Sequence, residues 1–225
     1  MLAAPARRLR RCSSSVTFDL FAYARLRPYL YHLTARRNLP RIQSKRTLES
    51  AASLARQANE AAMLGSRRDT HRAVVVDGTP VMLRDQSPLH ERNMRLEDGW
   101  TFERFIAHLN ERVFFWPGGD TGPNDYGLRH FTRYQAEQPV IVRVPFISLC
   151  NANPQAVPLF AKYNSGSPRW SGGAPPVRGP RTFISADTAP FTAGDVVEVT
   201  FQGGVTLPTD AVVADAPSGA WTPLI

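Results

Sequence analysis

Three groups of residues have side chains that could carry out chemistry. His32 and Thr34 close a short apolar run that starts at Tyr29, and Glu198 interrupts a run of β-branched and apolar residues. An imidazole and a carboxylate can bind hydroxyl groups, transfer protons and stabilise positive charge. The third group is the aromatic run Phe114–Trp116. It is a core strand by default, but Trp116 precedes Pro-Gly-Gly and could line the wall of a pocket.

Each group also has an explanation that involves no function. His32 alone is more consistent with a half-buried strand histidine that bonds to backbone. Strand alternation puts Glu198 on the face of Val196 and Thr200, which favours a solvent-facing carboxylate by about two to one. A carboxylate in a cleft is costly unless it is used. The remaining histidines have no metal-ligand spacing, so we expect no metal, and we expect them at the surface: His71, His90, His108 and His130.

Periodicity, caps and turn signals predict the elements that position these groups. Phe18, Phe21 and Leu26 should share one side of the first helix, and Leu128 and Phe131 should face inward. The alanine-rich segment 48–64 has the strongest helix-forming composition, with Gly65 as its C-cap. We expect helices at 17–27, 38–42, 48–64, 101–112 and 124–138, strands at 29–33, 73–76, 80–84, 113–116, 140–146, 182–185 and 194–202, and a long loop at 151–181.

Helices gather early and strands late, which predicts an α+β fold with a mixed or antiparallel central sheet flanked by helices. The length of 225 residues suits one sizeable domain. We expect a basic disordered leader at 1–16, a single domain at 17–215 and a poorly ordered tail at 216–225. No stretch approaches the roughly 20 apolar residues of a membrane span, so no membrane partner is expected. Two distant cysteines, Cys12 and Cys150, make no disulfide framework, so the cytoplasm is the expected location.

The formal charge of +8 is unevenly placed. Residues 1–46 hold eleven Lys and Arg against one acid, Asp19, so this part carries +10 and the rest carries −2. A basic N-terminal region of this kind favours a polyanionic partner, DNA or RNA. A solvated arginine-rich leader explains the charge equally well, and its Arg, Ser and Ala content without acids also fits an organellar transit peptide.

Three segments together resemble a known family. Tyr31-His32-Leu33-Thr34 with Asn38-Leu39-x-x-Ile42 resembles the opening strand and helix of ADP-ribosyltransferases of the DarT type. The segments 110–116 and 194–205 are similar to the second strand and the late glutamate-bearing strand of these enzymes. A bacterial family shares these segments and the stretches 163–166 and 178–179. The resemblance spans roughly Tyr29 to Pro208, in pieces. Ser44-Lys45-Arg46 replaces the glycine that usually follows the first helix, and the Arg-Ser-Pro-Met segment has no counterpart after Trp116.

The resemblance implies a split sheet, NAD as a substrate, and transfer of ADP-ribose to a nucleic-acid base or a protein side chain. Glu198 and His32 would be catalytic and would line one cleft. Other residues would contact NAD: Leu33 through its backbone, Thr34, Asn38, and Phe115, Trp116 or Tyr163 by stacking on nicotinamide. Arg84, Arg112 and Arg178 are the candidates for pairing with the pyrophosphate.

The implied role is a toxin or phage-defence effector, with a possible antitoxin or other protein partner. Two alternatives stay open. The same fold with a decayed site could bind nucleic acid or a partner through its basic N-terminal region, or the protein could simply hydrolyse NAD.

Overall fold

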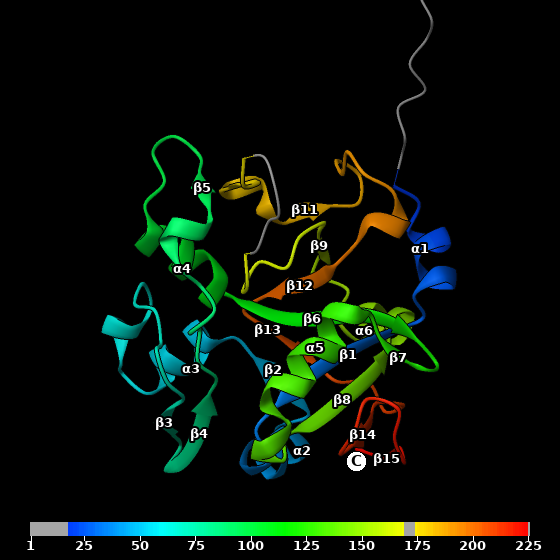
Figure 1. The fold of residues 1–225 in the computed structure, drawn as a ribbon. Helices are drawn as coiled ribbons and strands as arrows, with labels where there is room; N and C mark the ends of the chain where they lie inside the picture. Colours follow the sequence, from blue (N-terminus) through cyan, green and yellow to red (C-terminus); the bar gives the residue numbers. More distant parts are fainter. Residues whose placement is uncertain (1–17, 169–173, 225) are drawn as a thin grey trace, which may run out of the picture.

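A computed structural model describes residues 18–168 and 174–224 (Figure 1). The predicted leader at 1–16 lies outside these residues. The fold belongs to the α+β class, with a large antiparallel sheet and six short α-helices in the described part. None of the helices described has the length and apolar character needed to cross a membrane.

The central sheet has nine strands, and every neighbouring pair in it is antiparallel. The predicted α+β class and antiparallel sheet are therefore confirmed. The strand order is β11 (Ile184–Ser185), β9 (Leu159–Ala161), β12 (Glu198–Gln202), β6 (Arg112–Gly119), β1 (Tyr29–Thr34), β8 (Val140–Pro145), β14 (Val212–Ala214) and β15 (Thr222–Pro223), with β7 (Gly122–Pro123) paired to β6.

The two neighbours of β6 use different halves of this strand. β1 pairs with its second half, and that pairing ends at Tyr31 opposite Trp116. β12 pairs with its first half, starting at Val199 opposite Phe115. The strand continues through Pro117 to Gly119, beyond the predicted stop at Pro117, because β1 pairs with Pro117 and Gly118, β7 pairs with Gly118 and Gly119, and proline lacks just one donor. β1 and β12 consequently extend from different halves of β6, and the sheet is split between these two strands.

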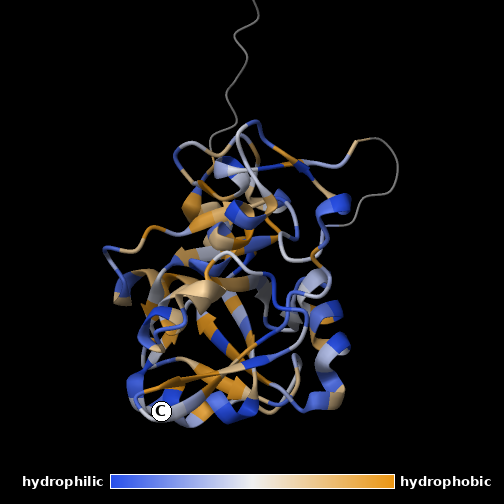
Figure 2. Cartoon of the chain, turned by 90° about the vertical axis from the view of Figure 1, so that its left-hand side faces the viewer, coloured by the Kyte–Doolittle hydropathy of each residue, from blue (hydrophilic) through white to orange (hydrophobic). Residues whose placement is uncertain are grey.

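Apolar residues are concentrated in the interior strands, which are orange in Figure 2, and buried apolar side chains pack against both faces of this sheet. On one face, strand residues pack against helices α1 (Leu20–Leu26), α2 (Leu39–Lys45) and α6 (Phe146–Ala152). On the other face, Tyr134 of α5 (Asp125–Tyr134) packs with strand residues of β1 and β8. Each fully buried large side chain contributes about 1.5–3 kcal/mol, so this double-sided core holds the split sheet in place.

Local signals predicted several elements correctly. Asp77 and Gly78 both have positive φ and join β3 (Arg72–Val76) to β4 (Thr79–Leu83) as a hairpin. Thr101 caps α4 (Phe102–Asn110) and Asn124 caps α5 through side-chain bonds to backbone N–H groups. The short 3₁₀ turns are Arg36–Asn38, Ala61–Met63, Glu91–Asn93, Gln135–Glu137, Pro180–Thr182 and Ala193–Asp195.

The predicted helix over 48–64 is wrong in extent. Residues 47–49 form β2 (Thr47–Glu49), which pairs with β13 (Gly204–Thr206), and the helix α3 covers only Ala51–Gln57. Ser50 caps α3, and Asn59 ends the helical run with a φ of 57°. Pairing with a remote strand has overridden the local helix propensity.

Other predictions of burial and order also need correction. Phe21, Leu26 and Leu128 are exposed, although Phe18 is buried. The predicted loop at 151–181 contains β9 and β10 (Val177–Arg178), and β10 pairs in parallel with β5 (Arg95–Leu96). The expected tail contributes β15 to the central sheet and buries Leu224.

Candidate active site

A cavity of about 250 Å³ lies where β1 and β12 separate. Its walls come from β1, β6, β12, α5, the segment after β4 and the loop after β9. His32 and Glu198 both line it, so the structure brings together the two residues that the sequence singles out. The other predicted residues on its wall are Leu33, Thr34, Asn38, Arg84, Arg112 and Trp116.

Strand alternation alone would keep His32 and Glu198 apart. If both ladders continued one pair beyond their last observed pairs, His32 would lie opposite Phe115, which pairs with Val199, and Glu198 would lie opposite Trp116. Residues one position apart point to opposite faces of an unbroken sheet. β1 and β6 diverge after Tyr31, so this constraint no longer holds. The cavity that lies at the divergence is lined by both side chains.

Glu198 is buried, with 3% of its surface exposed, so the favoured expectation of a solvent-facing carboxylate is wrong. Its Oε2 atom accepts hydrogen bonds from the Ser165 backbone N–H at 3.0 Å and from the Ser165 hydroxyl at 2.5 Å. The described residues give Oε1 no hydrogen bond. Burial raises the pKa of Glu198 to about 7, although the Ser165 bonds and the charge of Arg178 oppose this.

His32 bonds to backbone, as the simplest explanation of its sequence context predicts. Its Nδ1 atom lies 2.9 Å from the carbonyl oxygen of Phe114, on the strand from which β1 has separated. Burial lowers the pKa of His32 to about 4, so the ring is neutral at pH 7. A neutral ring that donates from Nδ1 to a carbonyl has Nε2 as a hydrogen-bond acceptor. His32 is thus suited to receive a bond from a hydroxyl group.

Asn38 and Thr34 hold the cavity wall together. The Asn38 amide accepts from the Met82 backbone N–H at 2.8 Å and donates to the Met82 carbonyl at 2.9 Å. It also lies 3.1 Å from the Thr34 hydroxyl. These bonds use the whole amide to fasten β4 to the end of β1, which makes Asn38 a positioning residue for this wall.

Arg84 presents a partly buried and poorly satisfied cation to the cavity. Its Nε and Nη2 atoms are buried and have no hydrogen-bond partner among the described residues. Nη1 lies 3.5 Å from a carboxylate oxygen of Glu137, and the guanidinium lies 4.4 Å from the centre of the Tyr134 ring. Burial lowers the pKa of Arg84. A buried donor without an acceptor is costly, so this group favours an anionic ligand.

Two further arginines on the wall have backbone partners. Arg68 donates from Nε to the Arg84 carbonyl at 2.8 Å and from Nη1 to Asn110 at 3.0 Å. Burial lowers the pKa of both Arg68 and Arg112 to about 10. Arg112 donates to the His108 carbonyl at 2.5 Å and lies over the Phe183 ring. Of the arginines on the cavity wall, Arg84 retains the most unused donors in the described part of the chain.

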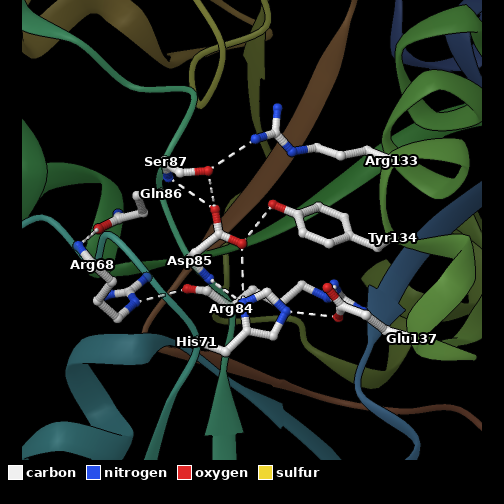
Figure 3. Close-up of polar contacts among 9 residues, drawn as sticks. All are labelled: Arg68, His71, Arg84, Asp85, Gln86, Ser87, Arg133, Tyr134 and Glu137. Carbon is white, nitrogen blue, oxygen red and sulfur yellow. Dashed lines mark hydrogen bonds and ion pairs between the residues drawn. The ribbon is translucent and has the colours of Figure 1, made fainter.

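A polar network around Asp85 fixes the position of Arg84 (Figure 3). Asp85 accepts bonds from the backbone and hydroxyl of Ser87 and from the Tyr134 hydroxyl. His71 lies between two carboxylates, 3.0 Å from Asp85 and 2.7 Å from Glu137. Burial acts to raise the pKa of Asp85, but the bonds from Ser87 and Tyr134 outweigh it and lower the pKa. The network ties the segment after β4 to α5.

Three predicted residues lie elsewhere. Phe115 is fully buried in the core and does not line the cavity, so the prediction that it stacks on a ligand there is not supported by its position. Tyr163 and Arg178 line an adjoining hollow of about 800 Å³. The sequence also gave no signal for two neighbours of the cavity. Ser165 is buried beside Glu198, and burial lowers the pKa of His130 to about 3, so His130 is not the surface histidine expected.

Comparisons with known proteins show one match. A family model described as a family of unknown function, DUF7002, matches residues 28–212. This range contains every residue of the cavity described above. No curated protein and no solved structure matches the chain.

Proposed function

The chain belongs to DUF7002, a family of unknown function, and we propose that it is an NAD-dependent ADP-ribosyltransferase with Glu198 and His32 at its centre. We also propose that the split antiparallel sheet is an ADP-ribosyltransferase-type sheet. The observation that carries the proposal is that one cavity is lined by a buried carboxylate and a neutral imidazole, and that the described residues leave one carboxylate oxygen and one ring nitrogen without a hydrogen bond.

The arrangement suits cleavage of the bond between nicotinamide and ribose. That cleavage leaves positive charge on the ribose C1′ atom, and a fixed carboxylate in a low-dielectric cavity stabilises such charge strongly. Oε1 of Glu198 is the oxygen available for this, because Oε2 is held by Ser165. As the nucleophile bonds to C1′ and nicotinamide departs, the carboxylate accepts the proton that the nucleophile loses.

The other cavity residues bind and orient in this proposal. Nε2 of His32 accepts a bond from a ribose hydroxyl, and Trp116 supplies an aromatic wall. Arg84 pairs with the pyrophosphate, because its unsatisfied buried donors match a bidentate anion. The cavity of about 250 Å³ is small for a ligand site, but it adjoins the hollow of about 800 Å³ and shares Pro88, His130, Asn164 and Ser167 with it.

Release of nicotinamide from NAD tests the proposal. The full chain should release it, and Glu198→Gln should lower the rate by about two orders of magnitude or more, because the fixed anion is lost. Glu91→Gln is the matched control, since Glu91 is exposed and does not line the cavity. Equal rates for Glu198→Gln and the unaltered chain, or no release by the unaltered chain with any candidate acceptor, would refute the proposed activity. ADP-ribose found free in solution instead of attached to an acceptor would show NAD hydrolysis.

A further inference from the structure

The hairpin of β3 and β4 is a separate two-stranded sheet with one free edge. The outer edge of β4 faces the body of the molecule, because Asn38 binds the backbone of Met82 there. The hairpin lies at the lower left of Figure 1, with β3 on the side away from β8. None of the described strands pairs with the outer edge of β3. Two strands alone form a marginal sheet, so this edge can gain from a further strand.

The turn of the hairpin sets the hydrogen-bond pattern of β3. Asp77 and Gly78 have φ angles of 51° and 73°, so they form a two-residue turn of type I′. The two residues that flank such a turn are a hydrogen-bonded pair, and non-bonded and bonded pairs alternate from there. Counted back from the turn, Val75 and Ala73 fall in non-bonded pairs. Their N–H and carbonyl groups therefore point away from β4.

Two residues of β4 agree with this pattern. Pro80 lies opposite Val75 and has no N–H to donate. Met82 lies opposite Ala73, and its N–H and carbonyl groups bond to Asn38 instead of to β3. The outward N–H and carbonyl groups of Ala73 and Val75 have no hydrogen bond from the described residues. Each of these two residues thus offers one donor and one acceptor to a further strand.

The outer edge of β3 lacks the features that usually prevent pairing between sheet edges. Such edges commonly carry a proline, a lysine, an inward charge or a bulge. Residues 73–76 are Ala-Val-Val-Val, and their register with β4 is continuous. Val75 is 57% exposed, on the face of the hairpin opposite its small core. This edge therefore suits a partner strand that places a small apolar side chain beside Val75.

The strand is complementary to itself. Antiparallel pairing of two copies with Val74 at the two-fold axis puts Ala73 of each copy opposite Val75 of the other. The residues of each such pair exchange both bonds, so every outward group is used. Arg72 begins β3 and Asp77 follows its end, and their side chains are 57% and 65% exposed, although each also has an ion-pair partner within the chain. Antiparallel pairing brings the basic end of one strand to the acidic end of the other.

We propose that two copies of this chain associate through β3, which joins their hairpins into one antiparallel sheet. The edge of a five-residue strand is short, and it falls below the roughly 800 Å² per partner of a standard interface, so the dimer is weak. The proposal does not depend on the proposed activity. It bears on the cavity all the same, because β4 leads directly into Arg84 and Asp85 on the cavity wall.

Hydrogen exchange at a series of protein concentrations tests the junction at single residues. Sedimentation of the full chain up to about 1 mM should show a monomer–dimer equilibrium, as a small interface requires. Over the same range, exchange at the Ala73 and Val75 amides should slow in proportion to the fraction of monomer. The Val74 and Val76 amides bond to β4 within each copy, so their exchange should change much less.

Two variants of Val75 test the junction independently. Val75→Lys should weaken the dimer at least tenfold, because it adds a charge to both strands of the symmetric junction. Val75→Pro removes the outward N–H but leaves the ladder with β4 intact, and it should have the same effect. Val157→Lys is the matched control, since Val157 is also an exposed valine, at 61%, and lies outside the hairpin. Thermal melting confirms that each variant folds.

Four outcomes would overturn the proposal. The chain could stay monomeric throughout the concentration range, or it could dimerise without any change in exchange at Ala73 and Val75. Val75→Lys could dimerise as well as Val157→Lys. Finally, these two amides could become protected only when an extended peptide of another protein is added, which would assign the edge to that peptide instead of to a second copy.

Discussion

The carboxyl group of Glu198 is asymmetric, because Ser165 holds one oxygen and leaves the other without a bond in the described part of the chain. Burial and these bonds act in opposite directions on its pKa, which lies at about 7. A catalytic group with a pKa near neutral pH changes charge over the range in which the protein would work. Ser165 therefore influences both the position and the charge of Glu198.

Ser165→Ala should move the pH profile of nicotinamide release. In the unaltered chain we expect release to rise as pH increases through about 7, because Glu198 acts as an anion. Loss of the hydroxyl removes a bond that lowers the pKa of Glu198, so the midpoint should shift to higher pH. Ser148→Ala is the matched control, since Ser148 makes a similar bond to Asp210 at 2.6 Å outside the cavity. An unchanged midpoint would contradict the role of Ser165.

The sequence was informative at Glu198 and His32 and silent about Ser165. The carboxylate and imidazole stand out because they interrupt apolar strands. The Ser165 contact joins residues 33 positions apart, and a serine in a polar loop carries no periodicity that would distinguish it. The burial of Glu198 differs from the expectation for a related reason. Alternation describes one strand, whereas its burial depends on the loop after β9 that covers it.

Among the elements, those set by local signals were predicted and those set by remote pairing were not. Asp77-Gly78, Thr101 and Asn124 act on their own neighbours in sequence, so the hairpin and both helix starts could be predicted. Residues 47–49 form a strand only because β13, more than 150 positions later, pairs with them. Such non-local pairing has no signature in a helix-forming composition.

The side chain of Asn38 fastens the hairpin of β3 and β4 to the end of β1. Asn38→Ala should leave the Met82 N–H and carbonyl groups without their amide partner and lower the free energy of unfolding by about 1–3 kcal/mol. Urea denaturation measures the loss, and hydrogen exchange at Met82 should become faster. Asn151→Ala, at an exposed position of α6, is the control. Slow exchange at Met82 in Asn38→Ala would show that β4 is held by other contacts.

For the molecule as a whole, uneven charge along the sequence does not translate directly into a basic face. Arg36 pairs with Asp215 and Arg41 with Glu49, each at 2.8 Å. Acidic residues later in the sequence thereby neutralise part of the positive charge of residues 1–46. The hollow of about 800 Å³ beside the cavity instead takes its three arginines from residues 129–178, a region that net charge by sequence position does not distinguish.

Stability should fall in mild acid. Burial lowers the pKa values of His32 and His108 to about 4 and that of His130 to about 3, against 6.5 for an unfolded histidine. Groups with a lowered folded pKa contribute stability that is present above pH 6.5 and is lost as pH falls toward the folded value. Glu198 has the opposite sign, because its pKa is raised, but three histidines outweigh one carboxyl group.

Thermal melting between about pH 7 and pH 5 measures this loss as a decreasing midpoint temperature. His130→Asn should make the decrease shallower, since it removes one buried group that gains a proton on unfolding. His90→Asn is the control, because His90 is exposed. A midpoint that stays level or rises toward pH 5 would contradict the burial of these rings.

The split beside β6 also has a mechanical consequence. In the ladder, the strand group β11–β9–β12 and the strand group β1–β8–β14–β15 are joined through β6 alone, each along a different half of it. A small change in the twist of β6 therefore alters the spacing between β1 and β12 without breaking a backbone hydrogen bond. In an unbroken sheet, β1 and β12 would each pair with the whole length of β6, and those bonds would resist the same motion. The width of the cavity therefore depends on the conformation of β6.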